Sequence, residues 1–132
     1  MGIKFFFDEG LGYNLAKGLN TLGKNVVHVR DVFKPGTEDV VWLEYVGKNQ
    51  FALVTKDKGI RRKPNEKAML LKHKVVAFYL GGSEKSGHDV LRQLVNAWEN
   101  MEEKAASRFK KGTAYAFYVR PNGRTIDDLP LT

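Results

Sequence analysis

Acidic side chains follow several short apolar runs in this 132-residue chain, at the points where those runs end. Asp8 and Glu9 come directly after "IKFFF", and Asp57 closes the run "LVTKD". Glu38 and Asp39 stand between these two runs, in "GTEDVV". In an open parallel sheet, ligands bind beyond the carboxyl ends of the strands. If the apolar runs are neighbouring parallel strands, several of these carboxylates converge on one edge of the sheet.

Carboxylates that converge in this way repel one another unless something neutralises them. Hard divalent cations do so, and Mg²⁺ prefers a few carboxylates together with water. Such a metal can generate hydroxide and stabilise charge on a phosphoryl group. The acidic residues therefore predict a divalent metal site suited to phosphodiester cleavage.

Each acid also has a plainer interpretation. Asp and Glu often end strands because they are well solvated and favour turns. Asp39 could support the N-terminus of a helix. Asp31, which ends "VVHVRD", could pair with Arg30 or begin a turn. Asp8 and Asp57 are the stronger candidates because both leave strand-like runs directly.

The net charge of +7 favours a polyanionic partner, most often nucleic acid. Arg61, Arg62 and Lys63 follow Asp57 closely, and Lys58 is its neighbour. These cations are suited to contacting substrate phosphates beside the acidic site. The alternative is that they form a solvated lead-in to the next helix.

Several other kinds of site are excluded or disfavoured. The chain has no cysteine, which excludes disulfides and thiol chemistry and fits a reducing, cytoplasmic location. No apolar run is long enough to cross a membrane. His28, His73 and His88 lack metal-ligand spacing, and Gly81-Gly82 lacks the phosphate-loop pattern.

Short apolar runs alternate with helical patterns, which predicts an α/β fold. The expected strands are residues 3–7, 25–29, 51–55 and 75–80. The expected helices are residues 11–22, roughly 38–48, a segment beginning at Pro64, and a long helix opened by "SGHD" at 86–89. Residues 113–119 and 124–126 flank "RPNG", which predicts a hairpin. We expect one domain over residues 1–132, a three-layer α/β/α sandwich with a mostly parallel sheet and a C-terminal antiparallel edge hairpin.

Three of the expected helices carry apolar side chains at helical spacing. The first presents Leu11, Leu15, Leu19 and Leu22, with Gly23 as its C-terminal cap. The second, for which Thr37 is the expected cap, presents Val41, Leu43, Tyr45 and Val46. The long helix presents Val90, Leu91, Leu94, Val95, Trp98 and Met101.

The order of these motifs resembles the PIN-like domain superfamily of metal-dependent ribonucleases. The resemblance rests on "KFFFDEGL", the leucine-rich helix, "GKNVVHVRDVF" and "GTEDVVWLEYVGKNQFALVTKDKGI", and covers roughly residues 3–80. The chain is most similar to the compact PIN-like proteins that carry an acidic pair after the first strand. Some relatives are VapC-like toxins of toxin–antitoxin pairs.

The resemblance implies a Mg²⁺- or Mn²⁺-dependent endoribonuclease that hydrolyses RNA. Its catalytic and metal-binding residues would be Asp8, Asp39 and Asp57, with Glu9 and Glu38 in support. The basic residues that would bind substrate are Lys58, Arg61 and Arg62. A toxin role would add an antitoxin protein as a partner, and a homodimer is expected on the same ground.

The chain departs from the compact relatives at two places. Gly10 follows the acid pair where they usually have Asn, so a side-chain amide is missing. The superfamily often has a fourth acid, for which this chain has no clear match. Glu66 is a candidate to lie near the acidic site.

Two alternatives remain open from the sequence. A receiver-like signalling domain would use Asp8-Glu9 and phosphorylate Asp57, with Ser83 after the next strand. Arg120-Pro121 would then stand where a Lys-Pro pair is usual. A non-catalytic module that binds RNA or a protein partner could use the same fold.

Overall fold

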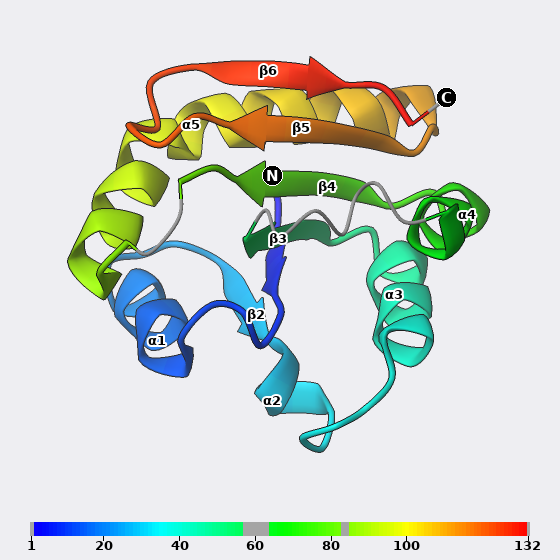
Figure 1. Ribbon diagram of the computed structural model, residues 1–132, viewed down its shortest axis with the longest axis horizontal. Coiled ribbons are helices and arrows are strands. Elements are labelled where there is room, and N and C mark those ends of the chain that lie inside the picture. Colours follow the sequence, from blue (N-terminus) through cyan, green and yellow to red (C-terminus); the bar gives the residue numbers. More distant parts are fainter. Residues whose placement is uncertain (1, 57–63, 83–84, 132) are drawn as a thin grey trace.

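A parallel sheet forms the centre of the computed structural model, which describes residues 2–56, 64–82 and 85–131. Within these residues the sheet has six strands in the order β2-β1-β3-β4-β5-β6 (Figure 1). The strands are β1 (Phe5–Phe7), β2 (Val26–His28), β3 (Ala52–Lys56), β4 (Val76–Leu80), β5 (Tyr115–Val119) and β6 (Ile126–Leu129). The first five are parallel, and β6 runs antiparallel to β5 at one edge. This arrangement confirms the predicted sheet and its C-terminal hairpin.

Helices cover both faces of the sheet (Figure 1). The buried cluster on one face includes residues of α1 (Tyr13–Thr21) and α5 (Gly87–Lys111). The cluster on the other face includes residues of α2 (Val29–Val32), α3 (Asp39–Lys48) and α4 (Pro64–Lys72). The predicted α/β/α layering is therefore confirmed. Among the helices of the described residues, none is long and apolar enough to span a membrane.

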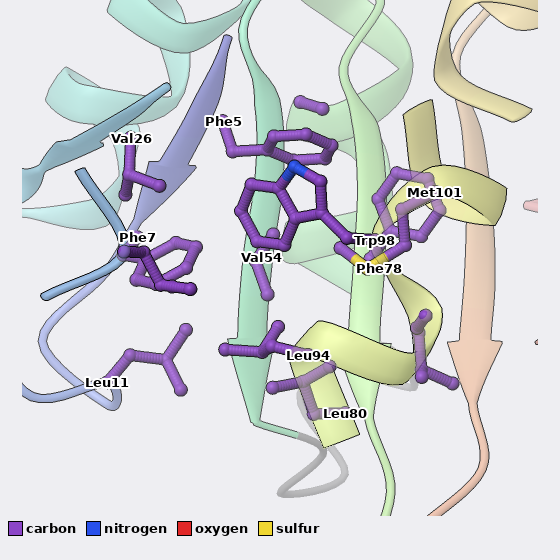
Figure 2. Packing of buried hydrophobic residues seen from close by; sticks show 14 of the residues in the cluster. Phe5, Phe7, Leu11, Val26, Val54, Phe78, Leu80, Leu94, Trp98 and Met101 are labelled. Atoms are coloured by element: carbon purple, nitrogen blue, oxygen red, sulfur yellow. The ribbon is translucent and has the colours of Figure 1, made fainter. Parts of the chain in front are cut away.

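The phenylalanine run of β1 supplies core residues to both faces. Phe5 packs under α5, with its ring centroid 4.6 Å from that of Trp98 (Figure 2). Phe6 points to the opposite face and stacks on Trp42 of α3 at 5.8 Å. Alternation along a strand sends successive side chains to opposite faces, and both faces here are covered. The strand is therefore apolar at every position.

Three residues of the predicted apolar helix faces are exposed instead. Leu22 is 67% exposed because α1 ends at Thr21, and the chain then reverses at Gly23 with a φ of 87°. Val41 is 46% exposed because Trp42 occupies the inward position on α3. Val95 of α5 is 50% exposed.

Two helix starts also differ from prediction. The second predicted strand is shorter, because α2 begins at Val29 directly after β2. Helix α3 begins after Glu38 rather than after Thr37, and Glu38 makes no side-chain capping bond. The start of α5 is as predicted, since the hydroxyl of Ser86 accepts a hydrogen bond from the Asp89 N–H at 3.2 Å.

Two helical glycines should respond oppositely to substitution by alanine. A Cβ at Gly47 would lie 2.2 Å from the carbonyl oxygen of His73, so G47A forces α3 away from the end of α4. A Cβ at Gly18 would meet nothing within 4 Å, so G18A gains only helix propensity. We expect G47A to lower the free energy of unfolding by about 1–3 kcal/mol. We expect G18A to raise it by about 0.5–1 kcal/mol, both measured by urea denaturation.

A loss of stability in G18A comparable to that in G47A would contradict this account of the α3–α4 contact.

Candidate active site

A cleft of about 170 Å³ opens at the carboxyl end of β1 and β3. Its described lining consists of Asp8, Glu9, Gly10, Thr37, Asp39, Trp42, Thr55 and Glu66. These residues come from the loop after β1, the start of α3, the end of β3 and the start of α4. The cleft therefore lies at the sheet edge that the sequence predicts, and we call it the acidic cleft.

Asp8 is fixed by the register of two neighbouring strands. Phe7 of β1 pairs with Val54 of β3, so the next positions along the two strands are Asp8 and Thr55. The Thr55 hydroxyl donates a hydrogen bond to Oδ2 of Asp8 at 2.5 Å. The Gly10 N–H donates to Oδ1 at 2.9 Å. Since both carboxylate oxygens accept hydrogen bonds, the orientation of the Asp8 carboxylate is set before any ligand arrives.

A tight turn begins at Asp8 and brings the next acid to the cleft. The Leu11 N–H donates to the Asp8 carbonyl at 3.1 Å, which closes the turn. On a fully extended strand, adjacent side chains point to opposite sides. Because the chain turns here instead, Glu9 lines the same cleft as Asp8.

Gly10 is close to the Asp8 carboxylate. A Cβ at this position would lie 3.1 Å from Oδ1 of Asp8, which is tighter than ordinary van der Waals contact. The backbone N–H of Gly10 already donates to this oxygen. Gly10 thus combines a backbone donor to Asp8 with the lack of a Cβ at this close approach.

The start of α3 contributes one of its two neighbouring acids. Asp39 is the first residue of α3 and lines the acidic cleft. Glu38 is exposed and is absent from the cleft lining among the described residues. Thr37 lines the cleft, while its hydroxyl donates to the Lys34 carbonyl at 2.7 Å.

Helix α4 adds Glu66 from its first turn. This half-buried residue lines the acidic cleft together with Asp8, Glu9 and Asp39. The sequence signal for it was indirect, namely a helix start at Pro64 shortly after the third strand. The remaining predicted residues of the site, Asp57, Lys58, Arg61 and Arg62, lie outside the described residues.

Asp31 stabilises the local structure around α2, and it is not part of the described lining of the acidic cleft. Its carboxylate accepts hydrogen bonds from the His28 N–H at 2.9 Å and the Tyr13 hydroxyl at 3.1 Å. The hydrogen bond to Asp31 raises the pKa of the Tyr13 hydroxyl. Asp31 therefore has a structural role, but through the capping of α2 and the Tyr13 hydroxyl rather than through the predicted pair with Arg30 or turn start.

His28 is a buried structural residue. Its Nδ1 accepts from the Arg30 N–H at 3.1 Å, which caps α2. Its Nε2 lies 2.7 Å from the Leu11 carbonyl, so this nitrogen carries the proton of the neutral ring. Both ring nitrogens are occupied, which agrees with the prediction that His28 is packed rather than a metal ligand.

The acidic cleft offers the donor chemistry that a hard divalent cation prefers. Its carboxylates and the threonine hydroxyls are all oxygen donors. Mg²⁺ commonly binds through one or two carboxylates and keeps several waters. In residues 2–56, 64–82 and 85–131, no three acidic or histidine side chains form a group that could hold a metal ion. A cation bound to the described carboxylates of the cleft would need water or further ligands to complete its coordination.

The comparison with protein families agrees with this fold and site. The family model described as PIN-like domain matches residues 3–82, from the start of β1 to just beyond β4. The chain therefore belongs to the PIN-like domain family, whose members are commonly nucleases that use divalent metals. Searches of curated proteins and of solved structures gave no match.

The hydrogen bond from Thr55 to Asp8 yields a test of the cleft. T55V keeps the shape of the side chain and removes the donor, so the Asp8 carboxylate loses the hydrogen bond to its Oδ2. We expect T55V to weaken Mn²⁺ binding about tenfold in calorimetric titration, as is typical when the partner of a ligand is removed.

The control is T55S, which retains the hydroxyl and should bind Mn²⁺ nearly as the unsubstituted protein does. Equal Mn²⁺ affinity in T55V and T55S would contradict this role for the hydroxyl.

Proposed function

We propose that this protein is a divalent-metal-dependent endoribonuclease that hydrolyses RNA phosphodiester bonds in the acidic cleft. The observation that carries the proposal is the fixed carboxylate of Asp8, which two donors hold at the cleft between β1 and β3. Three further carboxylates line the described part of this cleft. Membership of the PIN-like domain family supports nuclease chemistry over other uses of such acids.

The proposed catalytic residues are Asp8, Asp39 and Asp57, which would hold Mg²⁺ or Mn²⁺. When bound, the ion supplies a Lewis acid that lowers the pKa of water and neutralises charge on the phosphoryl group. Both carboxylate oxygens of Asp8 accept hydrogen bonds, whereas Asp39 is exposed at the start of α3. Glu9 and Glu38 are proposed to assist.

Glu66 is added to this proposed set because it lines the cleft directly. It stands in the first turn of α4. A carboxylate there can accept a proton or bind a water in the hydration shell of a cation. This position suits the fourth acid that is common in the superfamily.

The substrate is proposed to be RNA, held by its phosphates. The net charge of +7 favours a polyanion, and Lys58, Arg61 and Arg62, which follow Asp57 in the sequence, are proposed phosphate contacts. The receiver-like alternative has less support, because Arg120 is bound to Asp127 on the hairpin at 2.8 and 3.1 Å. That contact lowers the pKa of the Asp127 carboxyl.

A cellular role as the toxin of a toxin–antitoxin pair is a further part of the proposal and rests on the resemblance alone. It implies a cytoplasmic protein, an antitoxin partner encoded next to it, and a homodimer. The adjacent open reading frame is the cheapest place to look for the antitoxin.

The nuclease proposal is tested first at Asp8. D8N keeps one oxygen acceptor for Thr55 but removes the negative charge that a metal needs. We expect D8N to lower Mn²⁺-dependent cleavage of single-stranded RNA about 100-fold or more, because the metal loses a fixed anionic ligand. The assay is gel analysis of a labelled RNA, with and without EDTA.

The matched control is D128N, which changes an exposed aspartate on β6 and should cleave normally. Cleavage by D8N at the unsubstituted rate would overturn the proposal. RNA binding without any cleavage by the unsubstituted protein would favour the non-catalytic module.

The contribution of Glu66 can be separated from that of Glu38. Glu66 lines the acidic cleft, and Glu38 lies at the exposed start of α3. We expect E66Q to slow cleavage about tenfold, a typical effect of losing a group that orients metal or water. E38Q should slow it less in the same assay. A larger effect of E38Q than of E66Q would contradict the proposed role of Glu66 in the cleft.

A further inference from the structure

A second hollow opens at the same edge of the sheet, between the first turns of α5 and the turn that joins β5 to β6. Its volume is about 360 Å³. Its described lining consists of Lys85, Asp89, Arg92, Gln93, Asn96, Pro121, Asn122 and Arg124. We call it the basic pocket, because its lining carries three cations and one carboxylate.

A buried glutamine organises the floor of the basic pocket. Gln93 is 1% exposed, and its Nε2 donates to the carbonyls of Gly81, Val119 and Arg120 at 3.1, 3.2 and 3.1 Å. Three acceptors around this nitrogen fix which way the amide points. The amide oxygen is therefore directed at Lys85, whose Nζ donates to it at 3.1 Å.

Lys85 is held in place by neutral acceptors. Besides the amide of Gln93, its Nζ donates to the Pro121 carbonyl at 2.5 Å. An ammonium group has three N–H donors, and the third has no acceptor among the residues that the structure describes. Burial lowers the pKa of Lys85, while the charge of Asp89 acts the other way. A fixed cation that has no ion-pair partner at hydrogen-bond distance among the described residues favours an incoming anion.

The other two cations stand around Lys85. The side chain of Arg124 makes no hydrogen bond or ion pair within the described part of the chain, although its backbone N–H is fixed by Asn122 at 2.8 Å. Arg92 contacts His88 at 2.9 Å and, more loosely, Asp89 at 3.8 Å. The positive charge of the pocket is thus only partly balanced.

The turn that carries Arg124 is docked rigidly on α5. A Cβ at Gly123 would lie 2.2 Å from the Gln93 carbonyl oxygen, so only glycine allows this approach. Asn96 of α5 donates from its amide to the Asn122 carbonyl at 2.9 Å. These contacts hold the two sides of the pocket at a set separation.

The basic pocket and the acidic cleft both lie at the edge of the sheet where the parallel strands have their carboxyl ends. The acidic cleft is at β1 and β3, and the basic pocket is at β4 and β5. Lys56, at the end of β3, and Lys85 line a small hollow between them. Neighbouring strands are about 4.8 Å apart, so β3 and β5 are separated by about 10 Å. A few nucleotides of single-stranded RNA would bridge this span.

We propose that the basic pocket binds a backbone phosphate of the RNA whose scissile bond lies in the acidic cleft. Lys85 and Arg124 would contact the phosphate oxygens, and Lys56 would face the intervening backbone. This inference rests on the proposed ribonuclease function. It assigns a path for the RNA across the ends of β3, β4 and β5.

The test is equilibrium binding of a fluorescent single-stranded RNA to the full-length protein in EDTA, where no metal-dependent cleavage occurs. We expect R124Q and K85Q each to weaken binding roughly three- to tenfold, as loss of a charged phosphate contact does. Each should also reduce the slope of log affinity against log salt by about 0.7.

The control is K111Q, which removes an exposed cation from the far end of α5 and should change binding least. Unchanged RNA affinity in R124Q would overturn the proposal even if K85Q fails to fold. Weaker binding of polyglutamate without weaker binding of RNA would mark a protein-docking site and would equally overturn it.

These results are separable from those on the proposed function. If D8N abolishes cleavage while R124Q binds RNA normally, the proposed nuclease activity is supported and the proposed binding of substrate in the basic pocket is overturned. If D8N cleaves RNA normally, the nuclease proposal is overturned, regardless of how tightly R124Q binds RNA.

Discussion

The parallel register of β1 and β3 is the constraint on which the rest of this structure depends. It pairs Phe7 with Val54 and thereby sets Asp8 against Thr55 at the sheet edge. A shift of one residue would turn the β1 side chains to the opposite faces. Since Phe5 and Phe7 are fully buried on one face and Phe6 on the other, such a shift would disrupt both cores. The packing of the apolar strand β1 therefore fixes the hydrogen bond between Thr55 and Asp8 at its carboxyl end.

Much of this arrangement could be read from the sequence, because strand periodicity and the ends of apolar runs are local signals. The β-strands, the long helix and the "RPNG" hairpin were predicted with boundaries close to those observed. The position of Asp8 at the cleft follows from the parallel topology. Glu9 reaches the cleft through the turn that begins at Asp8, and Asp39 reaches it from the start of α3. The prediction for Asp57 falls outside the described residues and stays a prediction.

Other features depend on contacts between residues that are distant in the sequence, so the local sequence does not predict them. Helix α2 begins where a strand was expected to continue, because His28 and Asp31 cap it reciprocally. Val95 follows the apolar pattern of α5, yet half of its surface is exposed. Gln93 looked like an ordinary polar helix residue. Its role at the ends of β4 and β5 appears only when three carbonyls are placed around it.

The two described pockets at the carboxyl ends of the strands carry opposite charges. Carboxylates gather at β1 and β3, and cations gather at β4 and β5. In the acidic region, Asp8 after β1 accepts a hydrogen bond from Thr55 of β3. In the basic region, Gln93 of α5 donates to carbonyls at the ends of β4 and β5. On the proposed function, this division separates chemistry from substrate holding, because a phosphate would be repelled at one end until a cation is bound there.

The central claim is that the acidic cleft binds a divalent cation through Asp8. A crystal soaked in Mn²⁺ and measured for anomalous scattering tests it most directly. The account predicts a Mn²⁺ ion in the cleft, in contact with the carboxylates of Asp8 and Asp39 and completed by water. A cleft without Mn²⁺ at saturating concentration, or an ion bound only elsewhere on the protein, would contradict it.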